Sequence, residues 1–132
     1  MKVTDIPVDT NGRYELVSIT DEVKRVVREA GVDEGICIIY STHTTAAVTV
    51  NEDYDRDVPR DLAAACRAFL DALEVRFEHA EGNSDSHFLT SLFGQSQTLL
   101  VTDGGLDLGR WQGIFLAEFD GPRSRTVRIA VS

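Results

Sequence analysis

The sequence predicts a single α+β domain built mostly from antiparallel sheets, with two main helices. Its 132 residues, 42% of them hydrophobic and 27% charged, are enough to bury one core. No repeat and no linker rich in Gly, Ser or Pro divides the chain, so we expect one domain over residues 1–132. Strand-like runs come first, helical stretches follow, and strand-like runs fill the C-terminal part. This order favours α+β over a doubly wound α/β fold.

Apolar stretches with alternating or β-branched residues indicate the strands. The expected strands cover residues 2–8, 13–19, 36–41, 46–50, 98–101, 111–119 and 126–131. The runs at 36–41 and 46–50 are typical of two buried strands, or of one strand that His43 interrupts. Residues 78–86 are polar and contain Gly82, which predicts a loop. Residues 88–93 fit a short helix or a strand equally well.

Two stretches have helical spacing. Thr20 is expected to cap a helix over 21–30, with Gly31 at its C-terminal exit. A second helix is predicted to start at Asp55 or Asp57, with the acidic side chain as its N-cap, and to run to about Leu73. Apolar residues at helical spacing define its expected buried face: Val58, Leu62, Cys66, Phe69 and Leu73.

The charge balance excludes several classes of function. The chain has 22 acidic and 13 basic residues and a net charge of −9, so it repels nucleic acid and anionic membranes at long range. No apolar run approaches the ~20 residues of a membrane span. The N-terminal residues lack the apolar region of a signal peptide, and we expect a cytoplasmic protein with Cys37 and Cys66 as buried, reduced thiols. The acid-rich, lysine-poor composition fits salt adaptation or biased base composition equally well.

The three histidines carry the strongest chemical signal. His43 lies in a run of small hydroxyl residues between two expected strands, and His79 and His87 flank the polar loop. Three imidazoles and a water would form a catalytic metal site, with zinc the most suitable ion. The alternative is that each histidine satisfies a local hydrogen bond, because no signature fixes two ligands on one helix.

A second group of polar residues follows the strand expected at 46–50. Asn51, Glu52 and the aspartates up to Asp57 could hold magnesium, or supply a general base. Helix capping is the simpler explanation for the aspartates. Glu52 directly continues the strand, so it is the member expected to point into a site.

Two further segments are candidates for anion binding. Asp103, Gly104 and Gly105 follow a strand, and backbone amides at adjacent glycines can approach an anion closely, although a plain hairpin loop is the simpler interpretation. Arg123 and Arg125 follow the turn at 120–122. They could bind phosphate as planar forks, or pair with the many acidic residues at a strand end.

Three motifs together resemble the YjbQ family, also called UPF0047. They are STHTTAAVTVNEDYDRDVPRDL, HAEGNSDSHFLTSLFG and DGGLDLGRWQGIFLAEFDGPRSRTV, and the similarity covers the chain from about Gly35 to Ser132. The resemblance implies a YjbQ-like α+β fold, a homotrimer and sites near subunit boundaries. It also implies a secondary thiamine-phosphate synthase activity, which joins hydroxymethylpyrimidine diphosphate to a thiazole phosphate and releases pyrophosphate.

The resemblance also implies roles for individual residues. His43, His79 and His87 match the family's histidines and would be the metal ligands. Asn51, Glu52 and Asp103 match polar family positions, would line the same pocket and are the catalytic candidates. Apart from the resemblance, backbone amides around Thr42, Thr44 and Thr45, or those of Gly104 and Gly105, could bind the phosphorylated ligand. Arg123 matches a later motif of the family, in which ligand binding and a structural role are equally plausible.

We therefore expect a synthase-like transferase acting on a small phosphorylated metabolite. It would use a zinc-like ion at the histidines, with magnesium possible alongside a diphosphate. The alternatives are a metal-dependent hydrolase of a small phosphorylated or acylated metabolite, with Glu52 taking a proton from bound water, and a non-enzymatic metal- or anion-binding protein.

Overall fold

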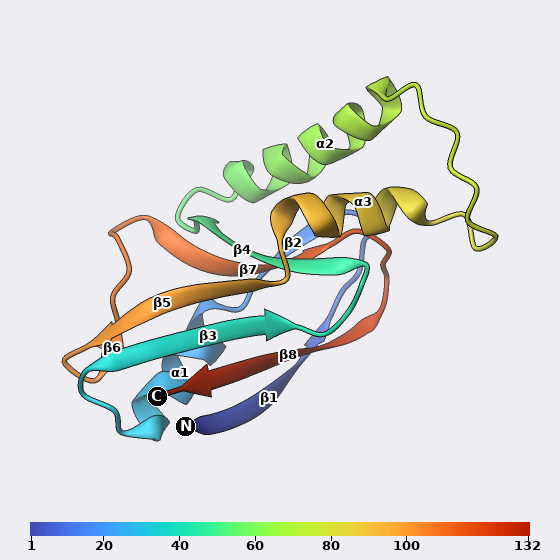
Figure 1. Cartoon of the computed structure of the whole chain (residues 1–132). Helices are drawn as coiled ribbons and strands as arrows, with labels where there is room; N and C mark the ends of the chain where they lie inside the picture. Colours follow the sequence, from blue (N-terminus) through green and yellow to red (C-terminus); the bar gives the residue numbers. More distant parts are fainter.

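Two antiparallel sheets and three helices make up the fold, seen in a computed structural model that describes residues 1–132 (Figure 1). One sheet has five strands in the order β1-β8-β3-β5-β6, and the other has three in the order β2-β7-β4. The strands are β1 (Lys2–Asp9), β2 (Glu15–Ser18), β3 (Gly35–Ser41), β4 (Ala46–Glu52), β5 (Ser96–Thr102), β6 (Gly105–Leu106), β7 (Gln112–Glu118) and β8 (Ser124–Val131). The helices are α1 (Thr20–Ala30), α2 (Asp57–Ala72) and α3 (Ser84–Phe93). This arrangement confirms the predicted α+β class.

The three-stranded sheet is a middle layer, buried on both faces, with β7 at its centre. On one face of β7, Ile114 and Leu116 pack in a core shared with α1 and the five-stranded sheet. On the other face, Phe115, Ala117 and Phe119 pack in a second core with residues of α2 and α3. Because both faces are covered, β7 is an apolar run in sequence rather than an alternating one.

The five-stranded sheet is buried on one face only, so its strands alternate. In β8, the inward side chains are Arg125, Val127, Ile129 and Val131, and the residues between them are more exposed. β8 pairs with β1 along its whole length and with β3 on its other side. The cationic Arg125 therefore occupies an inward position in an otherwise apolar series.

The start of α1 differs from the prediction. Ile19 occupies the N-cap position, and Thr20 is the first residue of the helix. The Thr20 hydroxyl makes no cap; it donates to Asp53 Oδ2 (2.7 Å) and accepts from the Ile114 amide (2.9 Å). The prediction that Gly31 ends the helix is confirmed, since this residue has a left-handed φ of 68°.

The α2 and α3 region also corrects the prediction. Arg56 rather than an aspartate is the N-cap residue of α2. The predicted buried face is only partly right, because Cys66 is buried whereas Phe69 is 46% exposed and stacks on Phe88. Residues 84–93 form α3, a third helix that resolves the ambiguity at 88–93.

The loop predicted over residues 78–86 is shorter than expected, because α3 already begins at Ser84. The runs around His43 are two strands in different sheets, β3 and β4. Both Cys37 and Cys66 are buried free thiols, and burial raises the pKa of Cys37 to about 11. No helix has the length and apolar character needed to cross a membrane.

Gly113 is a position where any side chain should destabilise the fold. A Cβ at Gly113 would meet Asp53, whose carboxylate joins Ser18 and Thr20 through hydrogen bonds of 2.5 and 2.7 Å. We expect Gly113→Ala to lower the free energy of unfolding by about 1–3 kcal/mol in urea titration. Gly12→Ala is the control, because its Cβ would make only ordinary contacts from 3.6 Å outward. Equal stability of the two variants would contradict this account.

Candidate functional site

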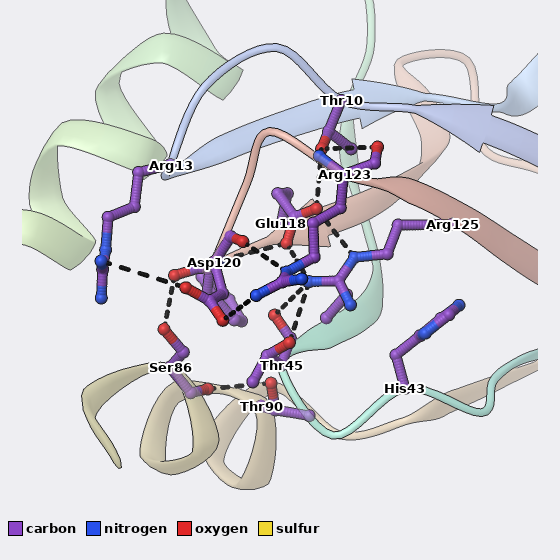
Figure 2. A network of polar contacts seen from close by, with 12 residues as sticks. Thr10, Arg13, His43, Thr45, Ser86, Thr90, Glu118, Asp120, Arg123 and Arg125 are labelled. Carbon is purple, nitrogen blue, oxygen red and sulfur yellow. Dashed lines mark hydrogen bonds and ion pairs between the residues drawn. The ribbon is translucent and has the colours of Figure 1, made fainter. Parts of the chain in front are cut away.

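A buried ion pair joins the two sheets at one end of the molecule (Figure 2). Glu118 continues the inward series of Ile114 and Leu116 on β7, and Arg125 begins the inward series of β8. Glu118 is fully buried and Arg125 is 6% exposed. Arg125 Nε donates to Glu118 Oε1 (2.8 Å), and Arg125 Nη2 donates to Oε2. The two alternation patterns therefore bring opposite charges together where the strands end.

Neighbouring groups complete this pair. Thr10 Oγ1 donates to Glu118 Oε1 (2.7 Å), and the Asp120 amide donates to Oε2 (3.0 Å). Burial acts to raise the pKa of Glu118, but the hydrogen bonds from Arg125, Thr10 and the Asp120 amide outweigh it and hold that pKa below its ordinary value. Arg125 Nη2 also donates to Thr45 Oγ1 (2.9 Å), while Nη1 makes no hydrogen bond within the chain.

Arg125 lines an open pocket of about 370 Å³ that has no hydrophobic lining residue. We call it the histidine–arginine pocket, and its lining residues are Thr42, His43, Thr44, Thr45, Glu81, Asn83, His87, Asp120, Arg123 and Arg125. Three segments supply them: the β3–β4 connection, the region around the start of α3, and the β7–β8 turn with the first part of β8. Hydroxyl groups, imidazoles and guanidinium groups therefore share one hollow.

His43 lies in this pocket as a neutral ring. Its Nε2 accepts a hydrogen bond from the Thr126 amide (3.0 Å). Burial and the nearby Arg125 guanidinium lower the pKa of His43 below its ordinary value of 6.5. At neutral pH the ring proton therefore belongs to Nδ1, which makes His43 a hydrogen-bond donor in this geometry.

Asp120 holds Arg123 at the rim of the pocket. Asp120 Oδ2 accepts from Arg123 Nη2 (3.0 Å) and from Asn83 Nδ2 (2.9 Å). Burial acts to raise the pKa of Asp120, but the bonds from Asn83 and Arg123 outweigh it, so that pKa is lowered. The Arg123 side chain is about half exposed, so its guanidinium can exchange this contact for a ligand without unfolding the turn.

A second polar hollow of about 400 Å³ adjoins the first. We call it the adjoining pocket, and its lining residues are Thr44, His87, Thr90, Ser91, Gly94 and Gln95. Thr44 and His87 line both hollows and so form a common wall. Neither hollow has an apolar lining residue, which favours small, charged or strongly polar ligands.

The histidines are only partly gathered within one chain. The rings of His79 and His87 lie edge to face with centroids 5.5 Å apart, and Glu81 Oε2 is 3.7 Å from His79 Nε2. His43 shares the pocket with His87, but its Nε2 already accepts the Thr126 bond. No group of three or more His, Cys, Asp or Glu side chains is placed to hold a metal ion. A single chain thus lacks a complete metal site, and metal binding at the three histidines stays a prediction.

Asn51 and Glu52 lie at the opposite end of β4 from Thr45. With a rise of about 3.3 Å per residue, Glu52 lies about 23 Å along the chain direction from Thr45, which directly precedes β4. Glu52 instead lines a shallow surface hollow with Tyr54 and Trp111. Within one chain, neither Asn51 nor Glu52 lines the histidine–arginine pocket, contrary to the shared pocket that the family resemblance implied.

Asp103, Gly104 and Gly105 are also distant, because β5 runs from the site to the opposite end of the sheet. They form the tight turn between β5 and β6, with left-handed φ angles of 50° at Asp103 and 76° at Gly104. The Gly104 amide donates to the Asp33 carbonyl (3.0 Å), and the Asp103 amide approaches Glu34 Oε1 (3.4 Å). The segment is a hairpin loop in which the amides of Asp103 and Gly104 already have partners, and anion binding at Gly104 and Gly105 stays a prediction.

Several central residues of the site were missing from the predicted set. The sequence prediction lacks Thr10, Asn83, Glu118 and Asp120, although all four contact the arginines or each other. The sequence pattern could have indicated the ion pair. Glu118 and Arg125 each lie at a position where the alternation along the strand predicts an inward-facing side chain. No signal of this kind existed for Asn83, whose role depends on how α3 packs against the β7–β8 turn.

Comparison with known proteins agrees with this architecture. A sequence model described as UPF0047 protein YjbQ-like matches residues 4–132. The chain belongs to this family. UPF0047 protein MJ1081 of Methanocaldococcus jannaschii is 46% identical over 127 residues, covering 94% of this chain and 89% of that protein. UPF0047 protein YugU of Bacillus subtilis is 42% identical, covering 94% of each chain.

Solved structures of the family share the fold. A YjbQ/UPF0047 family protein of Clostridium acetobutylicum is 38% identical with a TM-score of 0.93, covering 98% of this chain and 99% of that chain. A protein of unknown function from Sulfolobus solfataricus is 33% identical with a TM-score of 0.91, covering 98% and 95%. The YjbQ-like fold predicted from the sequence is thereby confirmed.

The buried pair should make a large contribution to stability, in contrast to an exposed pair on the same strand. We expect Arg125→Leu to lower the free energy of unfolding by about 3–5 kcal/mol, because it leaves the Glu118 carboxylate buried without a partner. Arg128→Leu is the control. It removes an exposed pair with Asp5, so the free energy of unfolding should stay close to that of the wild type. Urea titration at pH 7 measures both.

The effect of Arg125→Leu should also depend on pH. The folded-state pKa of Glu118 lies below its ordinary value of 4.5, so its stabilising effect is complete above that value. It is lost as the pH falls through the lowered pKa. The difference between wild type and Arg125→Leu should therefore shrink on acidification below pH 4.5. A difference that stays constant down to pH 2 would contradict this account of the pair.

Proposed function

We propose that this protein binds two small phosphorylated metabolites side by side and joins them with release of pyrophosphate, as thiamine-phosphate synthase does. The observation that supports this proposal is the pair of polar hollows with a common wall at Thr44 and His87. A reaction between two anionic substrates needs two neighbouring polar sites, and a hydrolase would need only one. The guanidinium groups at one hollow match the substrate that carries the leaving diphosphate.

The proposed reaction makes modest chemical demands on the protein. The bond between the methylene carbon of the pyrimidine and its diphosphate oxygen breaks, and the electron pair leaves with pyrophosphate. The thiazole nitrogen donates its lone pair to the same carbon and becomes the thiazolium nitrogen. No proton moves at the reacting nitrogen. The protein must therefore bind the two anionic substrates with the thiazole nitrogen next to the methylene carbon. It must also stabilise the negative charge that develops on the leaving pyrophosphate.

Three side chains of the histidine–arginine pocket suit that task. Arg125 is fixed by Glu118 and keeps Nη1 free to donate to the leaving diphosphate. Arg123 exchanges Asp120 for a phosphate oxygen, and neutral His43 donates its Nδ1 proton to another. Donors held in place before the substrate arrives stabilise developing charge without reorganisation during the reaction.

A homotrimer would reconcile this proposal with the distant candidates. Asn51, Glu52 and Asp103 can contribute only if another copy of the chain brings them to the pocket, because about 23 Å separates Glu52 from Thr45 within one chain. Light scattering tests the assembly, for which three copies are expected. Loss of activity in Glu52→Gln would support a shared site, whereas unchanged activity would limit the site to one chain.

The test of the proposed function is formation of thiamine phosphate from the two precursors by purified protein. We expect Arg123→Ala to lower the rate by about 10- to 100-fold, the effect of losing one charge-assisted hydrogen bond to the leaving group. Arg25→Ala is the control, since Arg25 forms an exposed pair with Glu29 on α1 and lines neither hollow nor the surface around Glu52. Pyrophosphate binding without turnover would favour a non-enzymatic anion-binding protein. Absence of both product and pyrophosphate binding would overturn the proposal.

A further inference from the structure

Asn83, at the start of α3, has a buried acceptor that the fold does not use. The residue is 8% exposed and lines the histidine–arginine pocket. It occupies the N-cap position, where an asparagine oxygen usually accepts an amide hydrogen of the first turn, but here the side chain makes no capping bond. Asn83 Oδ1 is the one buried side-chain oxygen or nitrogen in the chain that lacks a hydrogen-bond partner.

The orientation of the Asn83 amide follows from its neighbour. Asn83 Nδ2 donates to Asp120 Oδ2 (2.9 Å). The flipped amide would place its carbonyl oxygen against this carboxylate, where two acceptors repel each other. The atom without a partner is therefore the carbonyl oxygen, which can only accept. A buried acceptor without a donor destabilises the protein, and a donor from outside the chain removes that cost.

We infer that Asn83 Oδ1 accepts a hydrogen bond from the organic part of the ligand. The ligand class is then a phosphate ester that carries an N–H or O–H donor. This inference rests on the proposed function for the phosphate contact and adds a determinant of specificity to it. Asp120 and Glu81 lie in the same pocket, and their negative charges also favour a donor over an acceptor on the ligand.

The position of Arg123 limits the distance between donor and phosphate. Arg123 Nη2 and Asn83 Nδ2 bind the same oxygen of Asp120, at 3.0 and 2.9 Å. A phosphate at Arg123 and a donor at Asn83 are therefore bound by neighbouring side chains of one pocket, so a short spacer between them is expected. Simple two-carbon phosphate esters are for this reason suitable probes.

The experiment compares three probes by isothermal titration calorimetry. They are 2-aminoethyl phosphate, 2-hydroxyethyl phosphate and propyl phosphate, in which a methyl group replaces the donor. We expect the wild-type protein to bind the first two about 3- to 10-fold more tightly than propyl phosphate, the range typical of one added hydrogen bond. Binding of inorganic pyrophosphate is measured in parallel, because it tests the anion site without Asn83.

Asn83→Leu is the test variant, since leucine has a similar shape and no acceptor. The advantage of the two donor probes should fall to less than twofold, while pyrophosphate binding stays. Ser86→Ala is the matched control. It removes another buried hydrogen bond of α3, to the Phe119 carbonyl (2.6 Å), outside the pocket. Circular dichroism establishes that both variants are folded, and Asn83→Ala replaces the leucine variant if that one is not.

The outcomes separate the two proposals. If pyrophosphate binds but the three esters bind equally well to the wild type, the inference on Asn83 is wrong and the anion site stands. An advantage of the donor probes that persists in Asn83→Leu also overturns it, because the nearby carboxylates then explain the preference. If neither pyrophosphate nor any ester binds, the proposed function fails.

Discussion

The buried ion pair between Glu118 and Arg125 is the interaction on which the site depends. Glu118 is the last inward-facing residue of β7, and Arg125 is the first inward-facing residue of β8. Both lie next to the apolar side chains that these strands contribute to the core. Removing two charges from water is costly, and here the cost is offset because the carboxylate oxygens and Arg125 Nη2 are also bonded to Thr10, the Asp120 amide and Thr45. These bonds hold the Arg125 guanidinium in place beside the open histidine–arginine pocket.

The pocket is polar because it lies where the sheets end. Strand interiors supply apolar side chains to both cores, and hydroxyl, imidazole and acidic residues gather in the connections. The β3–β4 connection brings His43 there, and the first turn of α3 brings His87. The chemistry therefore belongs to segments far apart in the chain, held together by pairing between strands.

The strands were predictable because their apolar residues repeat regularly, and this part of the fold agrees closely with the sequence. His43, His87 and Arg123 line one pocket, whereas His79 does not line it, and the function of these residues stays a prediction. Asn51 and Glu52 were assigned to that site through the family resemblance, yet the length of β4 places them elsewhere in the chain. Sequence patterns indicate which face a residue occupies, but not which strand ends meet.

The position of β7 between two cores has a consequence for the dynamics of the protein. Its backbone amides lie between β2 and β4, and its side chains reach both hydrophobic clusters. Opening β7 to solvent requires both clusters to separate, so its amides should exchange with deuterium only through global unfolding. The outer helix α2 has a single buried residue, Cys66, and can open locally without disturbing the strand behind it.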